Sequence, residues 1–141
     1  MTSQKSNRKP KIENMAAGIV LRDGKFLVEK RRLDKEADPG YVEIPGGHAE
    51  PGETIEQTLR REMKEELGIT VLKERYLGSS LATATNGERG RIHYFLVEEW
   101  KGEIVSNEAE RVYWESDVAN LSIRPDRSVI KALLGSKTDS V

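Results

Sequence analysis

Residues 54–68 form the segment that most limits the possible folds, because they predict a helix with a capping residue at each end. Thr54 suits the N-cap, since its hydroxyl can accept a hydrogen bond from a free backbone amide of the first turn. Gly68 suits the position just past the last turn, which favours a left-handed backbone. At about 100° per residue, the apolar residues between them fall on one stripe: Ile55, Leu59, Met63 and Leu67. The segment predicts a helix over residues 55–67 that packs one face on a core.

The same helix carries acids where a core-facing helix should have apolar residues. On the helical wheel Glu66 falls inside the apolar stripe, between Ile55 and Leu59, and Glu62 falls on its edge. Glu65 and Glu66 also occupy the last turn, where the helix dipole favours cations. Glu62 and Glu66 are four residues apart and repel each other. A carboxylate turned toward a core stays charged only when a cation meets it there.

Two explanations of these acids remain open. In the first, they lie on a solvated face and are neutralised by Arg60, Arg61 and Lys64. In the second, a divalent cation explains why Glu66 faces inward. The chain has no cysteine, and the helix has no histidine, so oxygen ligands favour Mg²⁺ or Mn²⁺ over zinc.

Length and composition limit the class of protein. A chain of 141 residues fits one domain, and its net charge of −1 gives no electrostatic reason to bind a nucleic-acid backbone. No apolar run reaches the length of about 18 residues that a membrane span needs. The absence of cysteine suits a reducing cytoplasm. We therefore expect a cytoplasmic monomer or homodimer that binds neither nucleic acid nor a membrane.

The pattern of residues predicts a mixed sheet with two or three helices. We expect a disordered basic tail over residues 1–11, a single domain over residues 12–135 and a frayed tail over residues 136–141. Asp23-Gly24 predicts a two-residue turn that pairs the strands on either side of it. The expected strands cover residues 15–21, 25–30, 41–44, 69–77, 92–100 and 112–114. Residues 79–90 are expected to form a polar loop, and Pro125 to open a last helix.

Pro45-Gly46-Gly47 precedes the predicted helix and is the second unusual feature of this region. Glycine lets a backbone approach a ligand closely, because it has no Cβ. A pair of glycines at the end of a strand is also compatible with an ordinary turn. Both interpretations stay open at this point.

The spacing of Gly47, Glu53 and the run from Arg61 to Ile69 resembles the Nudix box. The order of the elements around it is similar to that of MutT-type Nudix hydrolases. This resemblance implies an α/β/α sandwich around a mixed β-sheet. It also implies Mg²⁺-dependent hydrolysis of a nucleoside diphosphate linked to another group, with Mn²⁺ as a substitute metal.

The resemblance also implies roles for individual residues. Glu62 would position or deprotonate the attacking water, Arg61 would orient the glutamates, and Glu53 would support Arg61. MutT-type enzymes often place a further acid in the loop after the long strand; Glu108 matches best, Glu110 is its rival, and both could be plain exposed loop acids. The implied metal ligands are Glu62, Glu65, Glu66, Glu108 and the carbonyl oxygen of Gly46.

The substrate is inferred by elimination within the family. The chain has no proline between Pro51 and Pro125, unlike ADP-ribose hydrolases, and it has Thr85 where dinucleoside polyphosphate hydrolases tend to have a tyrosine. This leaves a MutT-like nucleoside triphosphate pyrophosphohydrolase that releases a nucleoside monophosphate and pyrophosphate. The alternatives are an ADP-ribose, nucleotide-sugar or dinucleoside polyphosphate hydrolase, an RNA 5′-end hydrolase, and a nucleotide-sensing module without activity.

Four residues are candidates for contact with this small-molecule nucleotide. Arg31 and Arg32 could meet phosphate oxygens or belong to an ordinary basic loop, and Gly47 could let a phosphate approach. Asp126 aligns with an asparagine that MutT enzymes use to recognise an oxidised guanine, although it lacks the amide donor. It could equally be an acid that the start of a helix favours. The aromatic residues that could stack on a base or fill the core are Tyr41, Tyr94 and Phe95.

Overall fold

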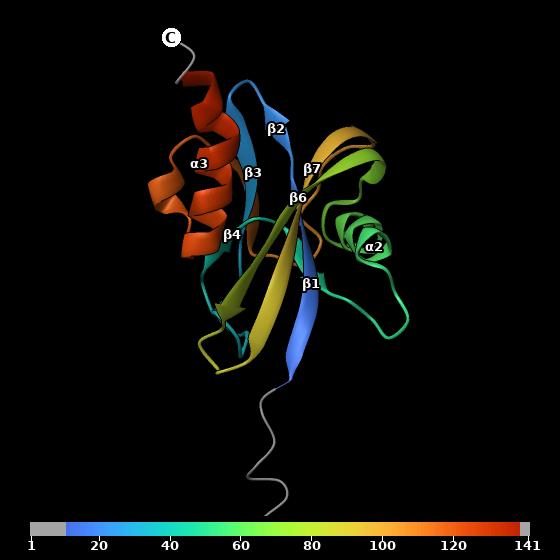
Figure 1. Cartoon of the computed structure of the whole chain (residues 1–141), viewed down its shortest axis with the longest axis vertical. Coiled ribbons are helices and arrows are strands. Elements are labelled where there is room, and N and C mark those ends of the chain that lie inside the picture. Colours follow the sequence, from blue (N-terminus) through green and yellow to red (C-terminus); the bar gives the residue numbers. More distant parts are fainter. Residues whose placement is uncertain (1–10, 139–141) are drawn as a thin grey trace, which may run out of the picture.

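The computed structural model describes residues 11–138. Helices α2 and α3 lie on opposite sides of the strands (Figure 1), which confirms the expected α/β/α sandwich. Neither helix in this described part is long and apolar enough to cross a membrane. The elements are β1 (Ile12–Ile19), β2 (Leu21–Arg22), β3 (Lys25–Lys30), β4 (Val42–Glu43), β5 (Gly46–His48), α2 (Ile55–Leu67), β6 (Thr70–Thr83), β7 (Arg89–Lys101), β8 (Arg111–Glu115), the 3-10 helix η1 (Val118–Asn120) and α3 (Arg124–Thr138).

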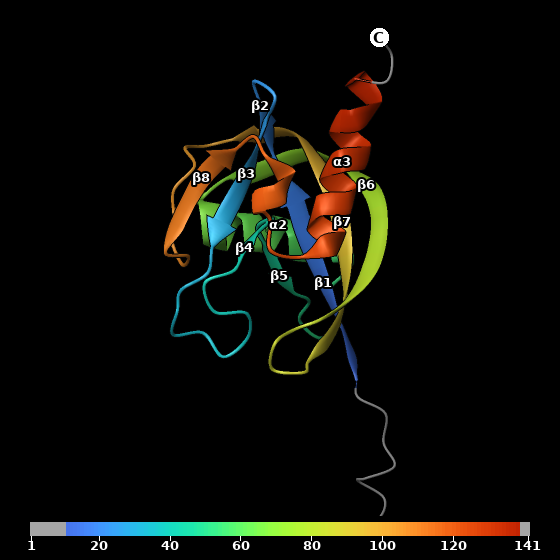
Figure 2. The same cartoon turned by 90° about the vertical axis from the view of Figure 1, so that its left-hand side faces the viewer.

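The strands form two sheets. The first has the order β5-β1-β7-β6 and is mixed, because β1 runs parallel to β7 while the other neighbours are antiparallel. In the second, β3 pairs antiparallel with β2, β4 and β8. Figure 2 shows β8 and β3 side by side, with β4 next to β3. The chain passes from one sheet to the other between the end of β1 and the start of β2.

Two core clusters fill the two sides of the sheets. Successive residues of a strand point to opposite faces, so β1 and β3 each contribute to both clusters. Ala16, Val20 and Leu27 pack with residues of α2 such as Leu59. The neighbouring positions pack on the side of α3 and include Ala17, Ile19, Phe26, Val28 and Ile130. This layering holds α2 against the sheets and fixes the direction of its inward side chains.

The predicted hairpin is right at its turn and wrong along most of its length. Asp23 and Gly24 have φ values of 54° and 77°, as a type I′ turn requires. In the second sheet only the short strand β2 pairs with β3 across this turn. Residues 12–19, which were expected to pair with β3, lie in the first sheet and run parallel to β7. The partner of this strand lies about 80 residues away in the chain, which local periodicity does not reveal.

Several predicted boundaries are corrected. Residues 79–90 are not a loop, because β6 extends to Thr83, β7 begins at Arg89, and only residues 84–88 form the hairpin tip. Their polar side chains alternate in exposure along paired strands, so backbone hydrogen bonding rather than hydrophobicity forms the element. Gly46–His48 is a strand paired with β1 rather than a turn. Helix α3 continues to Thr138, beyond the predicted boundary at residue 135, and residues 1–10 and 139–141 of the predicted tails lie outside the described residues.

Candidate functional site

Helix α2 has the predicted bounds and the predicted caps. The Thr54 hydroxyl accepts a hydrogen bond from Gln57 N at 3.1 Å, and Thr54 N donates to Gln57 Oε1 at 2.8 Å. These reciprocal bonds form a capping box. At the other end Gly68 has a φ of 73°, which only glycine adopts without strain. Both ends are therefore fixed, and with them the directions of the glutamates.

Glu62 and Glu66 face inward, as the helical wheel predicts. Each is 9% exposed, whereas the side chain of Glu65 is 47% exposed. The Oε2 atom of Glu66 is buried and has no hydrogen-bond partner. The explanation as a solvated face is therefore wrong for Glu66 and Glu62. A buried carboxylate oxygen without a partner is costly, and a cation removes this cost.

Glu29 joins these two acids and was missed by the sequence reasoning. It lies on β3, is 3% exposed and is close enough to Glu66 for each carboxyl group to shift the pKa of the other. The alternation of side chains along a strand predicts its direction. Leu27 faces α2, and Glu29, two residues further along the strand, points to the same face. We call Glu29, Glu62 and Glu66 the acidic cluster.

The electrostatics of the acidic cluster favour a bound cation. Burial, together with the charges of Glu29 and Glu62, raises the pKa of Glu66 to about 10. Burial also raises the pKa of Glu29 to about 7, against the opposing effect of Arg31. Burial raises the pKa of Glu62 as well, and Arg61 opposes that shift. In the described part of the chain no three acids or histidines already stand together at metal-ligating spacing. The case for a cation therefore rests on charge and on the orphan oxygen of Glu66.

Arg61 connects the loop before α2 with two of its glutamates. Its guanidinium donates to Glu53 at 2.6 and 3.0 Å, to Glu62 Oε1 at 2.8 Å and to Glu65 Oε2 at 3.1 Å. A further bond of 2.8 Å reaches the carbonyl oxygen of His48. The hydrogen bonds from Arg61 lower the pKa of Glu53 to about 2. This arginine therefore holds two carboxylates in place, with Glu53 as its own support.

Gly46 and Gly47 are required by close packing. A Cβ on Gly46 would overlap the backbone of Ala16 in the neighbouring strand. A Cβ on Gly47 would lie 2.6 Å from both carboxylate oxygens of Glu62. Glycine is needed here because strand β5 passes directly beside the acidic cluster.

The loop acids and the arginines are also placed by the structure. Glu108 lines a small pocket together with Glu29, Glu66, Arg31 and Arg32. Its rival Glu110 instead lies 4.0 Å from Lys30 Nζ. Glu43 lies 3.5 Å from Arg31, and Asp34 lies 2.8 Å from Arg32.

Asp126 lies in the first turn of α3 and is 2% exposed. One carboxylate oxygen accepts a bond of 2.5 Å from the Tyr94 hydroxyl, and the other accepts one of 3.0 Å from Ile44 N. Burial raises the pKa of Asp126 to about 6. Tyr94 and Phe95 are core residues at 2% exposure each, so of the two alternatives for them the structure favours a place in the core. Asp126 ties α3 to the residues just before Gly46.

The raised pKa values predict how metal and pH together control stability. When folding raises the pKa of a carboxyl group, the group contributes stability at pH values below its pKa in the unfolded chain. This contribution is lost as the pH rises to the pKa that the group has in the folded protein. For Glu29 the window runs from 4.5 to about 7. The melting temperature in EDTA should therefore fall between about pH 5 and about pH 8, and Mg²⁺ should restore it by about 5 °C at the upper end.

Thermal melts with Mg²⁺ or EDTA at matched ionic strength test this expectation. Mg²⁺ competes with protons for the carboxylates, so its effect should grow with pH. If Mg²⁺ raised the melting temperature equally at about pH 5 and about pH 8, the proposed link between this effect and the acidic cluster would be contradicted.

Comparison with known proteins places the chain in a family. The NUDIX domain model matches residues 13–131. The 8-oxo-dGTP diphosphatase of Haemophilus influenzae is 34% identical over 105 residues, which cover 74% of this chain and 76% of that protein. The CTP pyrophosphohydrolase of Escherichia coli is 32% identical over 104 residues, which cover 74% of this chain and 76% of that protein. The crystal structure of a MutT NUDIX hydrolase from Burkholderia pseudomallei superposes with a TM-score of 0.74 and 24% identity, covering 86% of this chain and 97% of that one. With the matched region spanning both sheets and the glutamate helix, this chain belongs to the Nudix family and is a MutT-like hydrolase.

Proposed function

We propose that this Nudix hydrolase cleaves nucleoside triphosphates to a nucleoside monophosphate and pyrophosphate, with Mg²⁺ as its metal. The observation that carries the proposal is the acidic cluster, in which a buried oxygen of Glu66 has no partner. A polyphosphate would be repelled by these carboxylates alone, and a divalent cation reverses the sign of the site. The names of the two relatives, an 8-oxo-dGTP diphosphatase and a CTP pyrophosphohydrolase, agree with a nucleoside triphosphate substrate.

The donor set suits a hard cation, because every candidate is an oxygen. The residues that would hold Mg²⁺ are Glu62, Glu65, Glu66, Glu108 and the Gly46 carbonyl. When bound, Mg²⁺ supplies charge neutralisation and a water of lowered pKa.

Glu62 and Arg61 divide the work of positioning and proton transfer. Arg61 occupies Oε1 of Glu62, which leaves Oε2 to accept a hydrogen bond from the attacking water. Glu53 keeps the guanidinium of Arg61 in place through two bonds. Attack at phosphorus mainly needs this positioning together with charge neutralisation.

The arginines and Asp126 are the proposed substrate contacts. Arg31 and Arg32 line the pocket of Glu66 and Glu108 and would meet phosphate oxygens. Gly47 lets the Glu62 carboxylate lie directly against β5 and would shape the substrate site through the position of Glu62. Asp126 is 2% exposed but lines a small pocket with Gly46 and Gly47. From this pocket its remaining lone pairs would accept from a donor on the base, since Tyr94 and Ile44 use one site on each oxygen.

A panel assay tests this proposal. Purified protein is incubated with Mg²⁺ and with canonical and oxidised nucleoside triphosphates, ADP-ribose, nucleotide sugars and dinucleoside polyphosphates, and the products are separated by chromatography. Release of pyrophosphate with a nucleoside monophosphate from a triphosphate is the expected result. Stepwise release of single phosphates, preferred cleavage of another class, or binding without cleavage would contradict it.

A further inference from the structure

The loop between β7 and β8, residues 102–110, crosses the C-terminal end of α2. The last carbonyls of a helix have no partner within the helix and need donors from elsewhere. Asn107 supplies two of them, since its Nδ2 donates to Glu65 O at 3.0 Å and its backbone N donates to Glu66 O at 3.1 Å. Val105 N donates to Leu67 O at 2.9 Å. The loop is thus hydrogen-bonded to the backbone of Glu65 and Glu66, whose side chains are proposed metal ligands.

The other end of the loop is bonded to the second sheet. Glu110 N donates to Lys30 O at 3.0 Å, one residue beyond Glu29. Glu108 therefore lies between two anchors, one on α2 beside Glu66 and one on β3 beside Glu29. Glu108 lines the same pocket as both of those acids. The distance between Glu108 and the acidic cluster depends on these two anchors.

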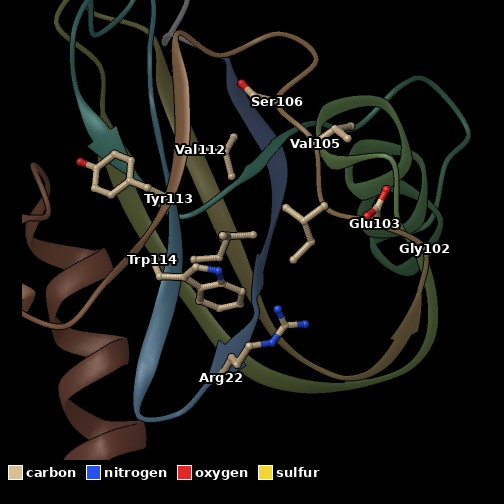
Figure 3. A pocket seen from close by; sticks show the side chains of 10 residues that line it. Arg22, Gly102, Glu103, Val105, Ser106, Val112, Tyr113 and Trp114 are labelled. Carbon is tan, nitrogen blue, oxygen red and sulfur yellow. The ribbon is translucent and has the colours of Figure 1, made fainter.

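Side-chain packing at Asn107 does not replace the two hydrogen bonds that this residue donates to the end of α2. A cavity of about 390 Å³ separates residues 102–106 of the loop from Val112 and Trp114 of β8. Figure 3 shows this space, with the loop on one side and Val112 and Trp114 on the other. The side chain of Asn107 itself is exposed. Ile104 of the loop packs on the core cluster beside α2, whereas at Asn107 hydrogen bonds rather than side-chain packing hold the loop.

From this geometry we infer that Asn107 is a positioning residue, whose amide places the Glu108 carboxylate against Glu66 and so sets the affinity for the divalent cation. The inference rests on the proposed metal-dependent function and adds a residue outside the box to it. Asn107 acts through Glu108 and touches neither metal nor substrate. Groups that orient metal ligands typically change metal affinity about 10- to 100-fold when they are removed.

Direct titration with Mn²⁺, followed by electron paramagnetic resonance, tests the inference without turnover. Asn107→Ala should raise the Kd for Mn²⁺ about tenfold. In the hydrolysis assay the Mg²⁺ concentration for half-maximal rate should rise by the same factor. The KM for the nucleotide at saturating Mg²⁺ should stay within about twofold. Should the alanine variant not fold, Asn107→Leu keeps the approximate size of the side chain, removes the donor without adding a charge and should show the same loss.

A matched control and a double variant make the test specific. Asn120→Ala removes an asparagine bond of 3.1 Å to Glu115, away from the acidic cluster, and should leave the Kd unchanged. Once Glu108→Gln is present, Asn107→Ala should add no further loss, because both changes remove the same ligand. An unchanged Kd in Asn107→Ala, or additive losses in the double variant, would overturn the inference. Tight Mn²⁺ binding without any triphosphate cleavage would instead refute the proposed function and leave the inference standing.

Discussion

Glu66→Gln is expected to lower kcat by about 10³-fold, a loss of about 4 kcal/mol of transition-state stabilisation. Glutamine fills the same space but carries no charge for the cation. The folded protein should not suffer, since Glu66 is buried beside Glu29 and Glu62 with one oxygen unpaired. We expect the melting temperature in EDTA at neutral pH to stay the same or to rise. Steady-state kinetics with Mg²⁺ and thermal melts measure the two effects.

Glu56→Gln is the matched control for this variant. It is the same substitution on the same helix, at an exposed position of the first turn. Its kcat should equal that of the wild type. Near wild-type turnover in Glu66→Gln would show that the charge of Glu66 does not serve the metal.

Gly47→Ala is expected to lower kcat by about 10²-fold, because the new methyl group would lie 2.6 Å from both carboxylate oxygens of Glu62. The backbone at Gly47 does not need a positive φ, so the effect isolates the collision with Glu62. Glu62 must turn away from Arg61 Nη1, from which it now accepts a bond of 2.8 Å. Kinetics should show a fall in kcat, and Mn²⁺ titration should show weaker binding.

Gly135→Ala provides the control, because a Cβ there meets no atom within 4 Å. It should have wild-type kcat and equal or higher stability, as helix α3 favours alanine over glycine. If Gly47→Ala kept full activity, β5 would have to be able to move away from α2.

The sequence was most informative where local rules act alone. Thr54, Gly68 and the apolar stripe predict the bounds of α2 correctly, because capping and periodicity are properties of neighbouring residues. The inward direction of Glu66 followed from the same periodicity. The family resemblance then added Arg61 and Glu53, whose contacts a helical wheel does not contain.

Long-range pairing explains what the sequence did not predict. Ser79 to Thr83 carry little hydrophobic signal and become a strand through the partner β7. Glu29 was overlooked because its role depends on α2, which follows it by some 25 residues in the chain. The proposal of Glu108 rather than Glu110 as a metal ligand draws on the path of a loop, which no local pattern encodes.

The bond between Ile44 N and Asp126 joins residues 82 positions apart, directly ahead of the two glycines beside Glu62. β3, which carries Glu29, likewise finds its long partner only in β8. During synthesis the glutamate helix can therefore form early, but the strand that faces it cannot pair with β8 until residues 111–115 have been made. Contacts this distant in sequence slow folding. The proposed metal site should thus be completed only after β8 and the first turn of α3 have been made.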